Sequence, residues 1–476
     1  MKGTIERNVV CGDEVIKVKF PERTRVLPEQ PVYTRPPLKD LEGAIREALA
    51  NPIAHDPIPK LVGKGAKVAI AFDDPAMEPT KPPGFRALCI KILLEELDKA
   101  GVDRHDIKLV CANALHRKWT RTELAPIVGD EISILWPPQR LYCHDAEDQE
   151  NLVFLGETDR GFEVEVNRVV TDSDLLIYIN ITTIPFSGGW KSIVVGLSSF
   201  RSIRHHHRAF PYASGKSVMD PKKSSFQKLL WEMGAVVEKH LAEKGRRIFS
   251  IESVANQSSP PEVVAVYAGH TPQVHEYTLE VLQELQVFDV EGQCDVAVYG
   301  VPNDSGYSRY SYINPLLVAE EGFEYSYSMF QNKPLVREGG IVILVNPCKN
   351  QFDEIHHPSY PEFYHRLLSI SKDPYELWSL FAEDFAHRPE YVHKYRYGYG
   401  FHGVHPFFMW NSHGAPKRHV SAVFMAGAQD FDVVRHLGFE PFATVEEAIA
   451  ETEERLGRDC SITHHAMPPK SIARVD

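Results

Sequence analysis

Short apolar runs rich in β-branched residues recur along the chain, separated by polar or turn-forming segments. Runs of this length and composition are typical of strands that are buried on both faces of a parallel sheet. We expect such strands at residues 67–72, 107–112, 175–181, 294–300, 341–346 and 420–425.

Between several of these strands the apolar positions follow the period of an α-helix. In residues 85–100 an apolar face alternates with charged positions, and Gly101 follows at the end, where helices favour glycine. We expect further helices at residues 225–240, 275–287 and 445–456, the last after Thr444 as its N-cap. Alternating strands and helices predict an α/β fold with right-handed crossovers.

The chain is expected to divide near residue 285, inside or just after the helix at 275–287. Residues 1–285 would form one α/β domain and residues 286–476 a second, both with largely parallel sheets and with the cofactor and substrate cleft between them. The length of 476 residues suits two or three domains of roughly 150 residues. The first 60 or so residues are expected to form hairpins at the edge of the first domain.

Charge and cysteine content narrow the classes of ligand. The chain carries 52 Lys and Arg against 65 Asp and Glu, a net charge of −13, which argues against nucleic acid or an anionic membrane as partner and favours small molecules. The seven cysteines form no Cys-x-x-Cys pair, so neither a disulfide scaffold nor a thiolate zinc site is expected.

No run approaches the roughly 18 apolar residues of a membrane span. We expect a soluble cytoplasmic protein, and nothing indicates its oligomeric state.

The glycine-containing loop after the strand at 175–181 is the first candidate for chemistry. Ser187, Gly188 and Gly189 would let the backbone approach a ligand closely, at the carboxyl edge of the sheet, where α/β proteins bind ligands. Lys191 follows at the mouth of this loop, where it would contact a phosphate or act as a nucleophile. The alternative is a solvated lysine after a glycine turn.

Histidines and carboxylates follow other strands. His116 follows the strand at 107–112, either as a general base or as a structural histidine. Asp73 and Asp74 follow the strand at 67–72, where they would orient a histidine, bind a ribose hydroxyl or cap the next helix. In the run of residues 205–207, at most one histidine can face a given site if the segment is helical, and a surface cluster is the alternative. A zinc hydrolase ranks last, because no helical His-x-x-x-His pair with a carboxylate is present.

Taken in order, these segments resemble the lactate racemase family, whose founding enzyme uses a nickel-pincer nucleotide. The likeness rests on Thr80-Lys81-Pro82, Leu115-His116-Arg117 and His144-Asp145, then on residues 151–156 and 164–167, and finally on Ser187-Gly188-Gly189-Trp190-Lys191 and His207. It covers residues 10–300 well and the rest loosely.

The resemblance implies specific roles. Lys191 would be the covalent attachment point of the nicotinate-derived ring, and His207 would ligate nickel in a square-planar site. His116 would remove the hydroxyl proton of a 2-hydroxy acid while a hydride passes to the ring, with Asp73 or Asp74 in support. The other expected cofactor contacts are Thr80, Lys81, Ser187, Gly188 and Gly189. The cofactor-synthesising enzymes would be partners.

Departures from the family pattern concern substrate handling. The second catalytic histidine of the lactate enzymes is replaced by Ile181, and the Arg of Thr-Arg-Pro by Lys81, which lacks a bidentate fork. The Tyr-Gln-x-x-Lys segment of the family aligns with residues 310–314. Residues expected near the substrate are Arg309, Tyr310, Ser311, Asn314, His402 and His405. Either of the last two would supply a second base, and structural loop histidines are the alternative.

The expected function is a nickel-pincer nucleotide-dependent racemase or 2-epimerase of a 2-hydroxy acid other than lactate, acting by transient hydride transfer. A larger polyhydroxylated or aromatic acid would suit the aromatic side chains around residue 310. Two alternatives stay open. One is a net oxidoreductase on the same cofactor, because a lone base would favour one face of the substrate. The other is a non-catalytic binding protein.

Overall fold

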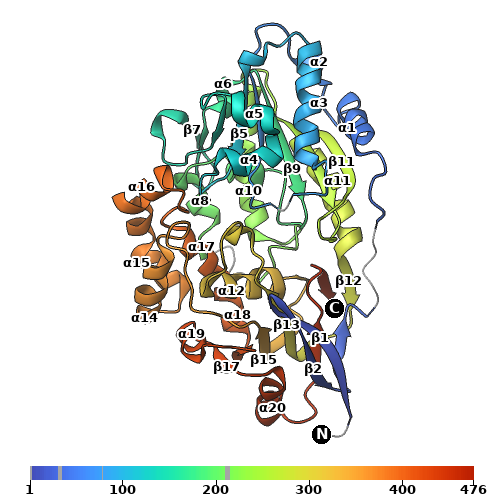
Figure 1. The fold of residues 1–476 in the computed structure, drawn as a ribbon, viewed down its shortest axis with the longest axis vertical. Helices are drawn as coiled ribbons and strands as arrows, with labels where there is room; N and C mark the ends of the chain where they lie inside the picture. The colour runs from blue at the N-terminus through green and yellow to red at the C-terminus, as the bar shows by residue number, and fades with distance from the viewer. Residues whose placement is uncertain (1–2, 30–34, 78, 210–214) are drawn as a thin grey trace.

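The computed structural model describes residues 3–29, 35–77, 79–209 and 215–476. It is an α/β protein built on two large, mainly parallel sheets with helices packed around them, as the sequence predicts (Figure 1). Within the described residues, no helix is long and apolar enough to span a bilayer.

The first sheet has six strands in the order β11-β10-β9-β4-β5-β6. Neighbouring strands are parallel except β10 and β11. Its centre is apolar, since β9 is buried along its whole length, and the three strands predicted in this part of the chain are confirmed. The strands are β4 (Val68–Asp73), β5 (Ile107–Ala112), β6 (Leu141–Cys143), β9 (Leu175–Thr182), β10 (Phe249–Ala255) and β11 (Val263–His270).

Helices and one hairpin surround this sheet. The helices predicted at 85–100, 225–240 and 275–287 are confirmed as α3, α10 and α11. The hairpin joins β7 (Leu152–Glu157) to β8 (Glu163–Asn167). The helices are α1 (Leu41–Ala50), α2 (Ile58–Leu61), α3 (Phe85–Lys99), α4 (Arg121–Val128), α5 (Asp130–Leu135), α6 (Val169–Asp172), α7 (Lys191–Val194), α8 (Phe200–His206), α10 (Ser225–Ala242) and α11 (Thr271–Gln286).

The second sheet has eight strands and contains the predicted strands at 294–300, 341–346 and 420–425, all confirmed. Its main path runs β17-β16-β15-β13-β1-β2, and β18 joins β13 to β3. The strands are β1 (Thr4–Gly12), β2 (Glu14–Pro21), β3 (Arg25–Leu27), β13 (Cys294–Pro302), β15 (Val336–Val345), β16 (Ala422–Ala426), β17 (Glu440–Phe442) and β18 (Ile462–His465).

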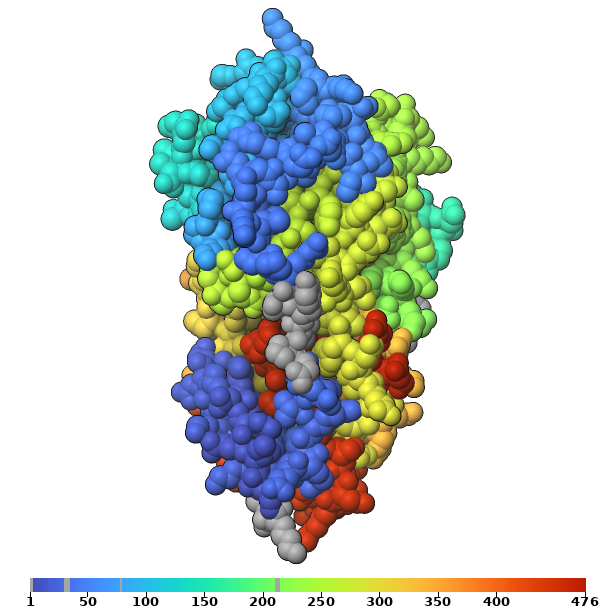
Figure 2. Space-filling view, turned by 90° about the vertical axis from the view of Figure 1, so that its right-hand side faces the viewer, coloured from blue at the N-terminus to red at the C-terminus, as the bar shows by residue number. Residues whose placement is uncertain are grey.

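The N-terminal hairpin belongs to this second sheet, so its expected place at the edge of the first domain is wrong. β1 pairs in parallel with β13, and β3 pairs with β18. The physical reason is the buried face of the hairpin: Val9, Val18 and Phe20 share a hydrophobic cluster with Val296 and Val298 of β13. Figure 2 shows the dark-blue N-terminal strands beside red C-terminal residues in the lower part of the view.

The helices of the C-terminal half cover this sheet, and the helix predicted at 445–456 is confirmed, with Thr444 as its N-cap. A small sheet joins β12 (Val287–Val290), β14 (Phe330–Gln331) and β19 (Ile472–Val475). A division of the chain near residue 285 stays a prediction. The helices are α12 (Pro315–Gly322), α13 (Tyr360–Glu362), α14 (Leu368–Ile370), α15 (Pro374–His387), α16 (Pro389–Tyr397), α17 (His405–Asn411), α18 (Gly414–His419), α19 (Phe431–His436) and α20 (Val445–Leu456), with π-helical turns at Phe323–Tyr327 and Phe363–Leu367.

Candidate active site

The candidate site lies where three parallel strands of the six-stranded sheet end. β4 ends at Asp73, and β5 ends at Ala112, shortly before His116. β9 ends at Thr182, before the glycine loop that leads to Lys191. Because neighbouring parallel strands place their carboxyl ends at one edge of a sheet, the three segments converge there, as the sequence predicts.

Asp73 connects the ends of β4 and β9. Its carboxylate accepts hydrogen bonds from the backbone N–H of Ile181 (2.8 Å) and from the hydroxyl of Tyr178 (3.1 Å). Burial raises the pKa of Asp73 to about 7. The buried guanidinium of Arg86 donates to the carbonyls of Asp73 and Asp74, both at 2.8 Å. These two hydrogen bonds fix the backbone of the turn.

Asp74 orients the histidine of the site. Its carboxylate accepts from Nδ1 of His116 (2.9 Å) and from Nε1 of Trp119 (3.1 Å). Helix α3 begins only at Phe85, whose N–H donates to Thr80 Oγ1 (2.8 Å), so Asp74 does not cap that helix. Asp74 therefore orients a histidine in this structure and does not cap the helix.

His116 has one ring nitrogen engaged and one available. Because a carboxylate only accepts, Nδ1 carries the proton of the bond to Asp74, and in the neutral ring Nε2 keeps its lone pair. Through the described part of the chain, no hydrogen bond reaches this Nε2. The rings of Tyr307, Phe401 and His405 surround it, with centroid separations of 5.3, 5.6 and 5.6 Å.

The glycine loop before Lys191 is held by a buried pair of side chains. The N–H of Gly189 donates to Oε1 of Glu252 (2.7 Å), and Oε2 of Glu252 accepts from Nδ1 of His275 (3.1 Å). Gly188 and Gly189 have φ values of +90° and +57°, and a Cβ on Gly189 would lie 2.6 Å from the His275 ring. The loop therefore requires glycine for both conformation and space.

We expect the Gly189→Ala variant to unfold at a lower urea concentration than the Gly65→Ala variant. Both glycines have positive φ, so each substitution costs about 1–2 kcal/mol of backbone strain. Gly65 has open space around its Cβ position, whereas Gly189 faces His275, which adds about 1–3 kcal/mol of overpacking. Equal unfolding midpoints for the two variants would contradict the close packing of Gly189 against His275.

Lys191 begins α7 and is not a freely solvated lysine. Its Nζ lies 3.5 Å from the centre of the Phe186 ring. Burial lowers the pKa of the Lys191 amine to about 8, against the opposing charges of Glu324 and Asp73. Glu324 lies on the π-helical turn of the C-terminal half, so charges from both halves of the chain act on the Lys191 amine. A lysine with a pKa near neutrality is a competent nucleophile.

The three consecutive histidines have three different environments. Nε2 of His205 bonds to Glu163 (3.0 Å). Nε2 of His206 donates to the carbonyl of Val194 (3.1 Å), and burial lowers the pKa of His206 to about 3, so this ring is neutral and its Nδ1 carries a lone pair. Nδ1 of His207 lies 2.6 Å from Nδ1 of His206 and must therefore donate.

It follows that His207 keeps the lone pair on Nε2. Burial, followed by the charges of His206, Lys191, His405 and His116, holds the pKa of His207 well below its usual range. A neutral imidazole whose other nitrogen is hydrogen-bonded is the form that binds metals. Among the described residues, no group of three or more His, Cys, Asp or Glu side chains is arranged to hold a metal. A metal at His207 would thus take its remaining ligands from a bound molecule.

Thr80 and Lys81, both expected to contact the cofactor, have other partners in this structure. Thr80 is buried, and its hydroxyl oxygen accepts a hydrogen bond from the N–H of Phe85, the first residue of α3. Nζ of Lys81 bonds to Glu262 at 3.0 Å, and the lysine side chain is 62% exposed. Contact of either residue with a cofactor stays a prediction.

Three of the six C-terminal residues expected near the substrate lie close to the site or its flank. His405 packs against His116, as described above. Tyr310 packs edge-on against Trp119, with ring centres 6.3 Å apart. Arg309 precedes Tyr310, and within the described part of the chain its buried Nε has no hydrogen-bond partner.

The other three have structural partners. Asn314 caps α12 through its side-chain oxygen and is fully buried. The hydroxyl of Ser311 donates to Asp353 (2.5 Å). His402 is fully buried, with Nε2 bonded to Glu147 (3.1 Å). A role in substrate binding for these residues stays a prediction.

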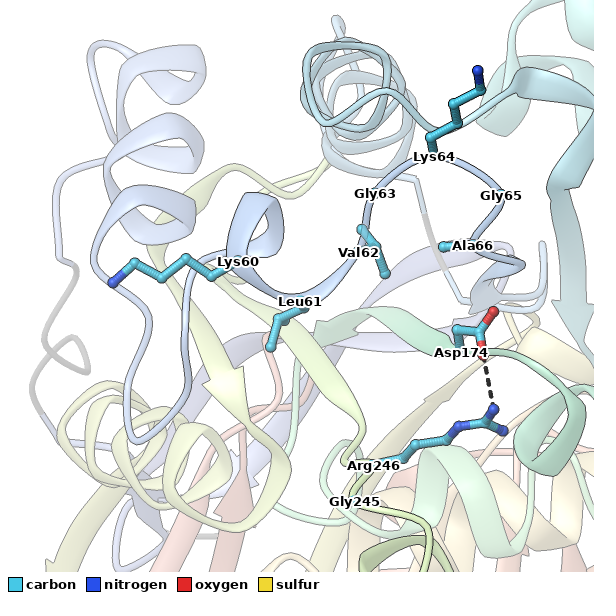
Figure 3. Close-up of a pocket in the computed structure, with 10 residues that line it drawn as sticks. All are labelled: Lys60, Leu61, Val62, Gly63, Lys64, Gly65, Ala66, Asp174, Gly245 and Arg246. Atoms are coloured by element: carbon cyan, nitrogen blue, oxygen red, sulfur yellow. Dashed lines mark hydrogen bonds and ion pairs between the residues drawn. The ribbon is translucent and has the colours of Figure 1, made fainter.

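A pocket of about 540 Å³ lies at the opposite edge of the six-stranded sheet (Figure 3). It is lined by residues 60–66, Asp174, Gly245 and Arg246, close to where β4 and β9 begin. Because ligands of α/β sheets bind at the carboxyl ends of the strands, this pocket is not the candidate active site.

Known proteins with a similar sequence or fold point to one family. Residues 11–219 match the lactate racemase N-terminal domain. The lactate racemase of Thermoanaerobacterium thermosaccharolyticum is 24% identical over 349 residues, 71% of each chain. That of Lactiplantibacillus plantarum is 23% identical over 427 residues, 88% of each chain.

Two solved structures share the fold. The lactate racemase apoprotein from Thermoanaerobacterium thermosaccharolyticum has a TM-score of 0.69 at 18% identity, over 99% of this chain and 100% of that one. A protein from Thermotoga maritima has a TM-score of 0.58 at 18% identity, over 93% and 100%. The N-terminal part of the chain thus matches a lactate racemase domain, and the whole chain is similar to lactate racemases in sequence and in fold.

The part that matches the lactate racemase N-terminal domain contains the side chains that converge at the strand ends. These are Asp73, Asp74, His116 and Lys191, all within residues 11–219, and His207 lies in the same matched part at the end of α8. The surrounding wall, with Tyr307, Glu324 and His405, comes from outside that match. The candidate site thus combines residues of the matched N-terminal part with a wall from the C-terminal half.

Sequence reasoning missed several residues of this site. Arg86 holds the Asp73–Asp74 turn, Trp119 shares Asp74 with His116, and Tyr360 bonds to His405. An arginine within the apolar helix at 85–100 was a signal for Arg86, because a charge on such a helix needs partners. Trp119 and Tyr360 carried no such signal.

Proposed function

We propose that this protein is a member of the lactate racemase family and acts as a nickel-pincer nucleotide-dependent racemase or 2-epimerase of a 2-hydroxy acid other than lactate. Family membership supports a racemase-type isomerase. The observation that carries the proposed nickel chemistry is the state of His207. Its ring is neutral and has a lone pair on Nε2, and the charges of Lys191 and His116 help to lower its pKa.

The residues present fit a covalently held nickel cofactor. Lys191, with its lowered amine pKa, would be the attachment point, and His207 Nε2 would be the protein ligand to nickel. The Gly188–Gly189 turn, packed against His275 and Glu252, would fix the loop that carries Lys191. When bound, such a cofactor supplies a nickel ion and a ring that reversibly accepts a hydride.

His116 would move the substrate hydroxyl proton. Its Nε2 carries a lone pair and is partly accessible, since the side chain is 24% exposed. As His116 becomes an imidazolium, the Asp74 carboxylate stabilises the positive charge through Nδ1–H. Trp119 holds the same carboxylate oxygen and keeps it aimed at the ring. Asp74 and Trp119 are positioning residues.

The wall around His116 supports a substrate other than lactate. Tyr307 and Phe401 pack against the ring. Ser311 and Asn314, which align with the family's carboxylate-binding segment, are engaged with Asp353 and with the first turn of α12. The side chains of Ser311 and Asn314 are therefore not free to bind the carboxylate of a small hydroxy acid.

A net oxidoreductase on the same cofactor is the second candidate. It is favoured by Ile181, which stands where the lactate enzymes have a histidine. Ile181 is 1% exposed and its N–H is bonded to Asp73, so no proton-transfer group comes from that position.

Replacement of His206 tests the assignment of the nickel ligand. We expect His206→Leu to lower nickel retention about 10–100-fold, because His207 loses the acceptor that fixes its tautomer. His205→Gln is the matched control, since His205 bonds to Glu163 instead. Nickel per protein would be measured by elemental analysis after dialysis. Equal retention in the two variants would refute the tautomer argument.

The function is tested with protein co-expressed with the cofactor-making enzymes. Pure enantiomers of a panel of 2-hydroxy acids, including aromatic and polyhydroxylated ones, are incubated with the protein and separated by chiral chromatography. We expect the mirror-image acid, or the 2-epimer, from at least one substrate other than lactate. Accumulation of a 2-oxo acid would favour the oxidoreductase, and turnover of lactate alone would overturn the proposed substrate class.

A further inference from the structure

We infer that Cys143 is an oxidation site for hydrogen peroxide or a small hydroperoxide, and that Cys111 completes the reaction as its disulfide partner. The two cysteines lie on β6 and β5, beside the candidate active site, and no step of the proposed function uses them. The inference therefore goes beyond that function, and only the effect of oxidation on turnover rests on it.

The two cysteines stand side by side on neighbouring strands. Cys111 of β5 and Cys143 of β6 are register partners in a parallel pair, and both are free thiols. Neighbouring strands lie about 4.7–4.9 Å apart, within the roughly 4.4–6.8 Å between Cα atoms that a disulfide spans. Register partners in a parallel pair also direct their side chains to the same face of the sheet. The backbone therefore already places the two side chains where a bond between the sulfurs can form.

The two thiols differ in access. Cys143 is half-buried and lines a pocket of about 220 Å³, whereas Cys111 is fully buried. A water molecule occupies about 30 Å³, so the pocket has room for hydrogen peroxide or a small hydroperoxide. Such a molecule reaches Cys143 before Cys111. The other residues that line the pocket are Lys118, Trp119, Arg396, Tyr397 and Tyr399.

The surroundings of Cys143 favour its thiolate. Hydrogen bonds from the Cys111 thiol and from the Trp119 N–H (3.3 Å to Sγ), together with the charge of Lys118, lower the pKa of Cys143 despite its burial. Burial raises the pKa of the Cys111 thiol well above its usual range. Because the thiolate is the nucleophile, Cys143 reacts first and Cys111 stays a thiol until the second step.

The other five cysteines, all of which lie in the described residues, lack this arrangement. Burial raises the pKa of each of their thiols, to about 11 in the case of Cys11. Cys11 and Cys294 are the two that lie on strands, and neither has a cysteine as its register partner. The combination of a neighbouring thiol, a pocket and a favoured thiolate is thus specific to Cys143.

The proposed oxidation has two steps. The Cys143 thiolate attacks one oxygen of the peroxide, the O–O bond breaks, and Cys143 becomes a sulfenic acid while the other oxygen takes a proton and leaves as water or an alcohol. The Cys111 thiol then attacks the Cys143 sulfur, the S–O bond breaks, and the hydroxyl leaves as water with the Cys111 proton. The two thiols together lose two electrons and two protons, and the peroxide takes them up.

In its reduced form Cys143 is a positioning residue for the candidate active site. Its Sγ accepts from the N–H of Trp119 and lies 3.7 Å from the carbonyl oxygen of the same residue. The indole of Trp119 donates to Asp74, which orients His116. A disulfide to Cys111 removes the acceptor of the Trp119 N–H. Oxidation therefore disturbs the Asp74–His116 pair and lowers turnover.

The first test needs no cofactor. The purified full-length protein is treated with hydrogen peroxide, the remaining thiols are blocked with N-ethylmaleimide, and the peptides are mapped by mass spectrometry without reduction. We expect a peptide pair joined through Cys111 and Cys143, lighter by two hydrogens, which dithiothreitol separates again. Recovery of both cysteines as N-ethylmaleimide adducts, or of Cys143 as a sulfinic acid without any disulfide, would overturn the inference.

The roles of the two thiols are separated by labelling rates and by one variant. Cys11 is the matched control, because it is also half-buried but has a raised pKa. We expect iodoacetamide to label Cys143 at least about 10-fold faster than Cys11 at neutral pH, since the thiolate fraction falls as the pKa rises. Cys111→Ser keeps a hydrogen-bond donor for Cys143 but cannot form the disulfide, so peroxide should leave a sulfenic acid that dimedone traps. Equal labelling rates, or no trapped sulfenic acid, would contradict the assignment.

The effect on turnover is measured on cofactor-loaded protein with a substrate that the wild type racemises. We expect formation of the disulfide to abolish most of the activity and dithiothreitol to restore it, with Cys11→Ser responding as the wild type does. Unchanged turnover in the oxidised protein, or a loss that dithiothreitol does not reverse, would refute the link through Trp119. A wild type without any racemase activity would instead refute the proposed function, and the disulfide test would still decide the oxidation site.

Discussion

We expect the Lys191→Ala variant, co-expressed with the cofactor-making enzymes, to retain no nickel and to lose racemase activity by more than about 10⁴-fold. The reason is that the hydride chemistry belongs to the cofactor, and the variant has no amine to hold it. The measurement is nickel content together with chiral product analysis on the same sample. The loss should exceed that of any other single substitution in the site.

Lys228→Ala is the matched control for this prediction. Lys228 is an exposed lysine on α10, away from the strand ends. We expect it to keep both nickel and activity. Full activity in Lys191→Ala, or equal loss in the two variants, would contradict the assignment of Lys191 as the attachment point.

The second large effect concerns the proton of the substrate hydroxyl. We expect His116→Asn to lower kcat about 10²- to 10⁴-fold with little change in KM, because proton transfer is made in the transition state. Asp74→Asn should lower kcat in the same way, since an amide places a donor or a neutral oxygen against Nδ1 of His116. Nickel content should match the wild type in both variants.

A surface pair of the same kind provides the control. His105 bonds through Nδ1 to Asp103, also at 2.9 Å, and its side chain is 87% exposed. His105→Asn should leave kcat within experimental error. If His116→Asn also retained full turnover, the wild type would be using another base, and the proposed proton route would be wrong.

The sheets and the main site segments were predictable because they depend on local pattern. The strand ending at Asp73 and the one before His116 are short apolar runs, and their carboxyl ends meet by the geometry of parallel sheets. The glycine loop before Lys191 follows β9 in the same way. These positions follow from the order of residues within single segments.

Features that depend on distant pairing were not predictable. The N-terminal hairpin pairs with β13, nearly 300 residues later, because its buried face matches that strand. Nothing in the run of three histidines says that His206 donates to Val194 and so sets the tautomer of His207. The environment of His402 likewise depends on Glu147, which is far away in the sequence.

The most direct test of the central claim is peptide mass mapping of the wild-type protein after co-expression with the cofactor-making enzymes. The account predicts a mass increment on the peptide that contains Lys191, with about one nickel per chain in the intact protein. The same peptide from cells without those enzymes should have its unmodified mass. An unmodified Lys191 peptide in protein that racemises a 2-hydroxy acid would contradict the account.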